Sequence, residues 1–128
     1  MNNYVFTIAR ILLGLMFAIF GLNGFLHFIP SPPSIPPAAG AFFGAMVQSG
    51  FYAFVFSVQL VAGILLLINR FVPLAIVTLA AVIANIIVVH VTMWPQALIP
   101  LPLIALVLWI VAAWPLRNRL VPVLLARS

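Results

Sequence analysis

The sequence contains no Asp, Glu, Lys or Cys, so its permanently charged side chains are five Arg. Without carboxylates, catalysis by paired acids or by a Ser-His-Asp triad has no acid to use, and proton-coupled transport lacks its usual membrane carboxylate. Without Cys there is no disulfide framework, no thiolate metal site and no CxxC redox pair. The two His in the chain cannot supply the three or four protein ligands of a zinc site. The sequence therefore predicts no catalytic residue and no metal site.

Charge is scarce, whereas apolar residues make up 67% of the chain and charged residues 4%. Soluble domains are roughly 45–50% apolar and about 25% charged, which excludes a water-soluble globule. The apolar runs are long and continuous, as in membrane helices, and do not alternate as barrel strands do. We expect an all-α membrane protein, with residues 1–128 forming one integral membrane domain built as a four-transmembrane-helix bundle.

Turn and proline signals divide the chain into four expected spans, at about 6–28, 51–69, 72–93 and 97–115. The first run is longer than the apolar region of a signal peptide, so we expect it to be a retained span. A Pro-rich segment at 30–37 cannot continue a helix, and residues 38–49 are too few to span. This region should form a Pro-rich outer loop with a short surface helix. Pro100 and Pro102 predict an irregular start to the last span, and the tail at 116–128 is expected at the inner surface.

The positive residues lie on one side of this arrangement: Arg10, Arg70, Arg117, Arg119 and Arg127 flank the termini and the second connection. Cytoplasmic loops of membrane proteins carry the excess of Arg and Lys. The pattern predicts a bacterial cytoplasmic (inner) membrane protein with both termini cytoplasmic, and it indicates that these Arg anchor the chain to lipid phosphates. The chain has no clustered basic patch, so nucleic acid is not an expected partner.

Small and polar residues interrupt the apolar spans. Gly14, Ala18 and Gly21 share one helix face, which predicts close approach of a second helix. The candidates for a polar pocket are Asn23, His27, Tyr52, Gln59, Asn85 and His90. The pattern leaves two interpretations open: interhelical hydrogen bonds, which are common in membranes, and a pocket for a head group or ring. Under either interpretation, Asn23, Gln59 and Asn85 should point into the bundle, because an unpaired amide against hydrocarbon is costly.

Several short segments resemble DoxX-like membrane proteins: Arg10 with Leu13, Gly14 and Phe17, the segment 20–25, the segment 59–67 followed by Asn69, Arg70 and Phe71, and the segment 85–90. The resemblance covers roughly the first 100 residues. It implies a small four-helix inner-membrane protein; some members associate with oxidoreductases, among them a thiosulfate-oxidising, quinone-linked complex and an oxidative-stress complex. The chain departs from the family at Gln59, where an acid is frequent, and at Asn23, where a basic residue is common. A role that needs that acid does not transfer.

The resemblance implies a non-catalytic or quinone-facing accessory subunit of a membrane oxidoreductase or another membrane complex. No cofactor is fixed by the sequence; quinone is compatible with it, whereas His27 and His90 could ligate a haem only by facing each other. The partners expected are the lipid bilayer and other membrane subunits. Two alternatives stay open: a small transporter or channel for a neutral solute, and a purely structural subunit. The sequence favours the absence of independent enzymatic activity without deciding it.

Overall fold

The computed structural model describes residues 3–26, 35–97 and 100–124, and all regular structure within these ranges is helical. The longer helices are α1 (Asn3–Leu26), α2 (Pro37–Ser49), α3 (Phe51–Leu67), α4 (Val72–Met93) and α5 (Leu101–Ala113). Shorter elements are α6 (Arg117–Leu120) and the 3-10 turns η1 (Pro95–Ala97), η2 (Trp114–Leu116) and η3 (Val121–Leu124). The all-helical class predicted from the sequence is confirmed, and so is a short helix between the first two expected spans.

Three helical segments are long and apolar enough to cross a membrane: Tyr4–Leu26, Val72–Met93 and Leu101–Leu120. The remaining candidate is a pair, because α3 has 17 residues and meets α2 at a bend of 93°. The fold therefore provides three membrane-spanning candidates, or four if α2 and α3 count as one broken span. The expected second span at 51–69 is realised as a helix that ends at Leu67.

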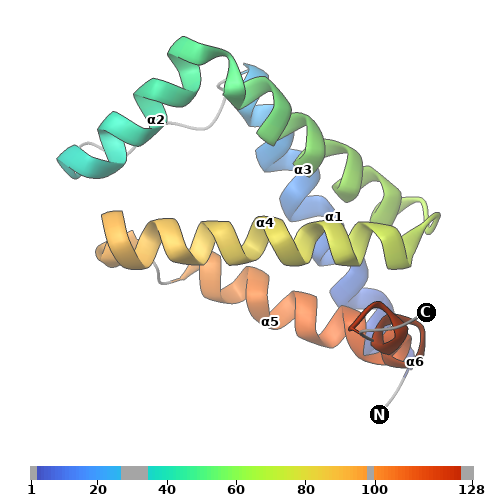
Figure 1. Cartoon of the computed structure of the whole chain (residues 1–128). Helices are drawn as coiled ribbons and strands as arrows, with labels where there is room; N and C mark the ends of the chain where they lie inside the picture. Colours follow the sequence, from blue (N-terminus) through green and yellow to red (C-terminus); the bar gives the residue numbers. More distant parts are fainter. Residues whose placement is uncertain (1–2, 27–34, 98–99, 125–128) are drawn as a thin grey trace.

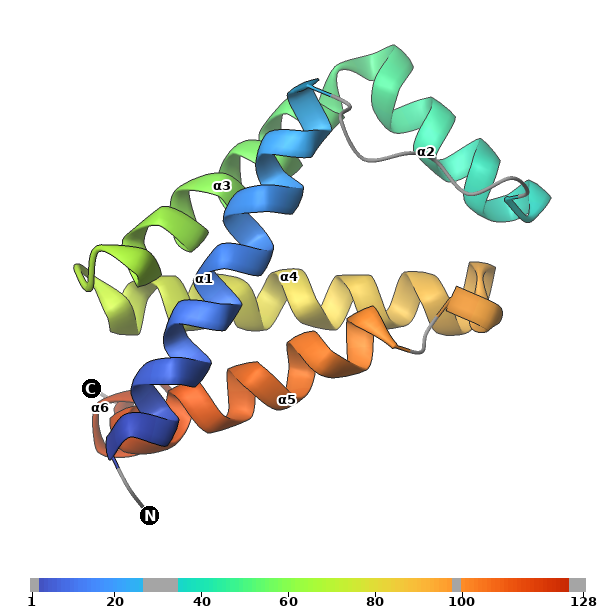
Figure 2. The ribbon, with the colours of Figure 1, turned by 180° about the vertical axis from the view of Figure 1, so that it is seen from behind.

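Helices α1, α3, α4 and α5 pack in a ring. In this ring α1 contacts α3 and α5, and α4 contacts the same two helices. Figures 1 and 2 show the start of α1, the α3–α4 turn and α6 at one end of the molecule, with α2 projecting at the other. The helices therefore place the described Arg-bearing segments together, far from α2.

The core is small and apolar, with Leu13 of α1, Leu66 of α3 and Ile76 and Leu79 of α4 fully buried. Trp109 of α5 donates its indole N–H to the carbonyl oxygen of Ile76 over 2.8 Å, which ties α5 to α4. Many large apolar side chains on the outer faces are exposed. This exposure would be unfavourable in water, but it fits a surface that meets lipid tails.

Left-handed backbone conformations mark the two corners of α3. Gly50, with φ of 80°, ends α2 and begins α3. At the other end, the N–H groups of Asn69 and Arg70 donate to the carbonyls of Leu66 (3.4 Å) and Leu65 (3.0 Å), as in a Schellman motif with Asn69 at φ of 58°. This motif stops α3 and makes the tight turn into α4.

Proline residues start the last two long helices. Pro73 lies in the first turn of α4, as the sequence predicts, because the first turn needs no N–H from this residue. The expected fourth span begins at residue 97, but Ala97 belongs to η1, and α5 begins at Leu101 with Pro102 in its first turn. The helical path then continues through η2 and α6 to Leu120.

Candidate functional site

The closest helix contact in the bundle joins α1 to α3 through glycine. A Cβ atom added at Gly21 would lie 2.6 Å from the backbone nitrogen of Leu60, and one at Gly63 would lie 2.5 Å from the backbone nitrogen of Ala18. Both distances are shorter than real Cβ contacts allow. The small-residue face of α1 thus permits close approach, as predicted, and its partner is α3. This contact places the centre of α3, including Gln59, against α1.

Gln59 is the buried polar residue at this contact, with only 7% of its surface exposed. Its amide makes no hydrogen bond to another described residue. Every fully buried side-chain N or O atom in the described ranges has a partner, so the Gln59 amide atoms are not fully buried. The Gln59 amide therefore keeps a small accessible surface inside an otherwise apolar wall. This amide faces apolar surroundings without a protein partner, and a ligand with a carbonyl or hydroxyl group would supply one.

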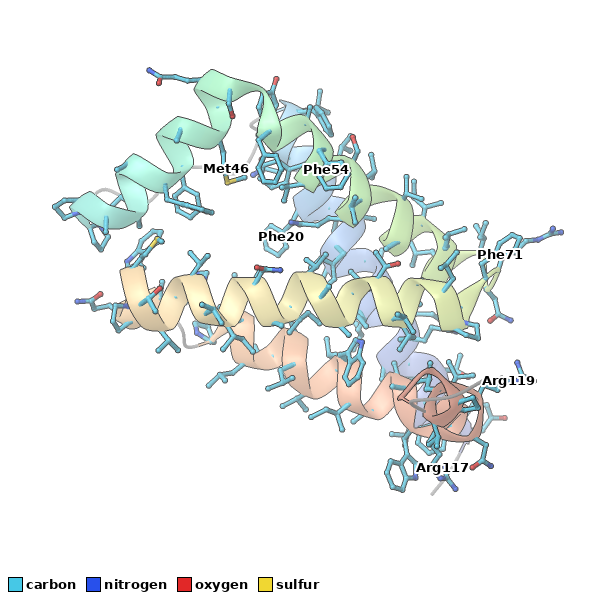
Figure 3. The ribbon with its side chains drawn as sticks, in the orientation of Figure 1. Phe20, Met46, Phe54, Phe71, Arg117 and Arg119 are labelled. Atoms are coloured by element: carbon cyan, nitrogen blue, oxygen red, sulfur yellow. The ribbon has the colours of Figure 1, made fainter. Side chains whose placement is uncertain are left out.

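Tyr52 lies on the same α3 face as Gln59, seven residues earlier in the chain. The Tyr52 ring is half-buried and contacts the ring of Phe25 in α1, with the ring centres 6.1 Å apart. Figure 3 shows Met46 and Phe54 at the corner where α2 meets α3, with Phe20 of α1 nearby. Aromatic and apolar side chains thus surround the end of the α1–α3 pair that adjoins α2.

The other two amides expected inside the bundle differ from Gln59. Asn23 of α1 is half-buried and takes part in an interaction. Asn85 is exposed, and its amide donates to the carbonyl of Ala81 in its own helix over 2.8 Å. Thr92, seven residues further along the same face of α4, is also exposed and donates to the carbonyl of Val88 over 2.7 Å. The structure therefore buries Gln59 but leaves Asn85 and Thr92 on an exposed face of α4.

His90 is half-buried near the end of α4. Its Nδ1 lies 2.7 Å from the carbonyl oxygen of Ile86, and since a carbonyl only accepts, Nδ1 donates. In the neutral ring, Nε2 is then the acceptor. The ring stacks on Trp94 with a centre distance of 6.1 Å and an angle of 10° between planes. His27 lies outside the described residues.

The arginines divide into two environments. Arg10 is half-buried and donates from Nη1 to the carbonyl of Leu66 in the last turn of α3. Arg117 is exposed, donates to the Trp114 carbonyl over 2.8 Å and lies 4.6 Å from the centre of the Trp114 ring. Arg70 and Arg119 are exposed, and Figure 3 shows Arg117 and Arg119 projecting from the α6 end. Arg127 lies outside the described residues.

Sequence reasoning assigned Arg10 to lipid phosphate and did not identify Trp109 as a contact residue. The structure shows an intramolecular acceptor for Arg10, the carbonyl oxygen of Leu66, which could not be predicted from the position of Arg10 near the start of α1. For Trp109 a signal exists, since an indole N–H in the middle of an apolar span needs a hydrogen-bond partner. Within the described ranges, no group of three or more His, Cys, Asp or Glu side chains could hold a metal ion.

No protein-family model, curated protein or solved structure matches the chain. The class is therefore defined by the structure: an all-helical protein with three to four apolar helices able to cross a membrane. Among the described residues, two polar features that a ligand could meet are the Gln59 amide at the α1–α3 contact and the His90–Trp94 pair at the end of α4.

Proposed function

We propose that this protein is a DoxX-like, four-span protein of the bacterial inner membrane. In this proposal it is a non-catalytic, quinone-facing accessory subunit of a membrane oxidoreductase or another membrane complex. The Gln59 amide carries the proposal, because it is a hydrogen-bonding group that is 7% exposed in an apolar bundle and has no partner among the described side chains and backbone groups. A quinone presents an apolar ring and tail together with carbonyl oxygens, which matches an apolar wall with one amide donor.

In the proposed topology both termini and the Arg70 turn are cytoplasmic. Support comes from the arrangement of the start of α1, the α3–α4 turn and α6 at one end of the molecule, away from α2. The chain contains no acidic residue that would offset the Arg charge at this end. Cytoplasmic placement of that end satisfies the positive-inside tendency and lets Arg70, Arg117 and Arg119 meet lipid phosphates.

The topology predicts the labelling of single cysteines introduced into the natural Cys-free chain. In spheroplasts, an impermeant thiol reagent should modify Gln96→Cys and Gln48→Cys at once, and Asn69→Cys and Asn118→Cys only after the membrane is permeabilised. All four residues compared lie in the described ranges and are exposed, so burial does not confound the result. Labelling of Asn69→Cys before Gln96→Cys would invert the proposed orientation.

The quinone proposal predicts the effect of removing one amide. Protein purified in mild detergent should retain quinone, detectable by extraction and chromatography, and Gln59→Leu should lose most of it. Gln48 is an exposed residue of α2, so Gln48→Leu is the matched control and should retain quinone. With quinone extracted from both proteins, replacing this unpaired amide by an apolar group of similar size is neutral or stabilising, so Gln59→Leu should then melt at or above the wild-type temperature.

Two results would contradict this role of Gln59. A lower melting temperature for Gln59→Leu with unchanged quinone content would identify the amide as a structural contact between helices. Wild-type protein that holds no quinone but co-purifies with other membrane polypeptides would favour the purely structural subunit. Quinone content of His90→Gln tests the His90–Trp94 pair separately, since this change removes the ring that stacks on Trp94 while leaving Gln59 intact.

A further inference from the structure

An open groove of about 320 Å³ lies between α3 and α4. Its lining includes Val58, Val61, Leu65, Leu74, Ala75 and Thr78. Val61 and Leu74 are 56% and 59% exposed, so the groove opens outward. Along α3 it extends from Ser57 to Leu65, which corresponds to about 12 Å of helix at the usual rise per residue. The groove is thus elongated along α3 and almost entirely apolar.

One end of this groove adjoins the α3–α4 turn, where Arg70 lies. The backbone N–H of Arg70 donates to the carbonyl of Leu65, a groove residue, over 3.0 Å. The side chain of Arg70 is exposed. Since the chain contains no Asp or Glu, no acidic side chain of the protein can neutralise this guanidinium. The turn that carries Arg70 therefore lies at one end of the apolar groove, and its guanidinium has no acidic partner in the chain.

We propose that this groove binds one anionic phospholipid, with an acyl chain along the groove and the headgroup phosphate at the Arg70 guanidinium. Arginine matches phosphate geometry through paired N–H donors, and the apolar lining favours a hydrocarbon chain. A second copy of the protein is a poorer occupant, because it brings further Arg and no acidic side chain to the same end. The inference rests on the proposed membrane location and is independent of quinone binding.

The headgroup contact is tested by native mass spectrometry of the full chain in detergent, titrated with phosphatidylglycerol or phosphatidylcholine carrying identical acyl chains. The wild type should bind phosphatidylglycerol more tightly. Arg70→Gln should weaken phosphatidylglycerol binding about fivefold, the contribution of one Arg near an anionic lipid surface, and leave phosphatidylcholine binding nearly unchanged. Arg119→Gln removes an exposed Arg of α6 that meets the same lipid surface outside the groove, so it controls for diffuse charge, and we expect a smaller loss than for Arg70→Gln.

The acyl-chain contact is tested by filling the groove. Val61→Trp places a large side chain at an exposed groove position, and binding of both lipids should fall. Val88 is 59% exposed and lines a different groove, between α4 and α5, so Val88→Trp is the matched control and should bind like the wild type. Leu74→Trp offers a second groove variant, and sn-glycerol 3-phosphate, which has the phosphate without the chains, should not displace bound lipid.

Equal affinity for the two lipids would overturn the proposal, and so would equal losses from Arg70→Gln and Arg119→Gln, which would indicate a diffuse charge effect. Unchanged lipid binding in both Val61→Trp and Leu74→Trp, or displacement by sn-glycerol 3-phosphate, would exclude the groove as the acyl-chain site. Quinone content measured on the same Arg70→Gln sample should equal that of the wild type. The two proposals can therefore fail separately.

Discussion

Replacing Gly63 by alanine should destabilise the bundle by about 1–3 kcal/mol or more, which is the range for forcing an added methyl group into a close-packed contact. The new Cβ would lie 2.5 Å from the backbone nitrogen of Ala18 and 2.7 Å from the carbonyl oxygen of Gly14. Backbone atoms cannot rotate away as a side chain can, so α1 and α3 must separate. Gly21→Ala should have a similar effect, because its Cβ would lie 2.6 Å from the backbone nitrogen of Leu60.

Reversible unfolding in mixed detergent micelles, followed by circular dichroism, measures this effect. The matched control is Gly44→Ala in α2, where an added Cβ meets nothing within 4 Å. All three substitutions gain the same intrinsic helix preference of alanine over glycine, about 1 kcal/mol, so the difference between them isolates the contact. Gly63→Ala and Gly21→Ala proteins as stable as Gly44→Ala would show that α1 and α3 are not packed as described.

The second large effect concerns Arg10, whose replacement by methionine should cost about 1.5–3 kcal/mol, the usual contribution of a hydrogen bond to a charged group. Its guanidinium donates to the Leu66 carbonyl in the last turn of α3, where a positive charge also interacts favourably with the helix dipole. Methionine keeps an unbranched side chain of comparable reach but removes every donor. The loss should appear in the same micelle unfolding measurement.

Arg119→Met is the control for this comparison, because Arg119 is exposed on α6 and exposed charges contribute little to stability. Its unfolding free energy should stay within about 0.5 kcal/mol of the wild type. If Arg10→Met and Arg119→Met were equally stable, Arg10 would serve the membrane surface, as the sequence alone suggests, and the contact with α3 would carry no stabilising free energy.

Much of the fold follows from the sequence, because helix formation inside a membrane is imposed by the need to pair every backbone group. The five prolines between 30 and 37, Gly50 and the Asn69–Phe71 turn fix where the helices begin and end. The 3.6-residue periodicity also places Gly14, Ala18 and Gly21 on one face. That these residues meet α3, and not α4 or α5, depends on contacts between segments far apart in the chain.

Whether the polar side of α4 faces the bundle or the surroundings could not be predicted, for a different reason. In a soluble protein the apolar face of a helix marks the core, but in a membrane protein both the core and the surroundings are apolar. The 3.6-residue period predicts that Thr78, Ala81, Asn85 and Thr92 share one side of the helix, yet it contains no signal for whether that side faces the bundle; in the structure Thr78 is half-buried and the other three are exposed. The exposure of Asn85 is accommodated by its hydrogen bond within α4. A bond within one helix is not among the arrangements predicted from the sequence.

The shortness of α3 has a consequence for the surrounding bilayer. At 1.5 Å per residue, the 17 residues of α3 extend about 26 Å, whereas the 24 of α1 and the 22 of α4 extend about 36 and 33 Å. A hydrocarbon layer is about 30 Å thick, so in the proposed four-span arrangement α1 and α4 would match it by tilting, while lipids beside α3 would compress. The protein should thus carry a one-sided zone of thinned membrane, and neighbours with short hydrophobic segments should collect along α3.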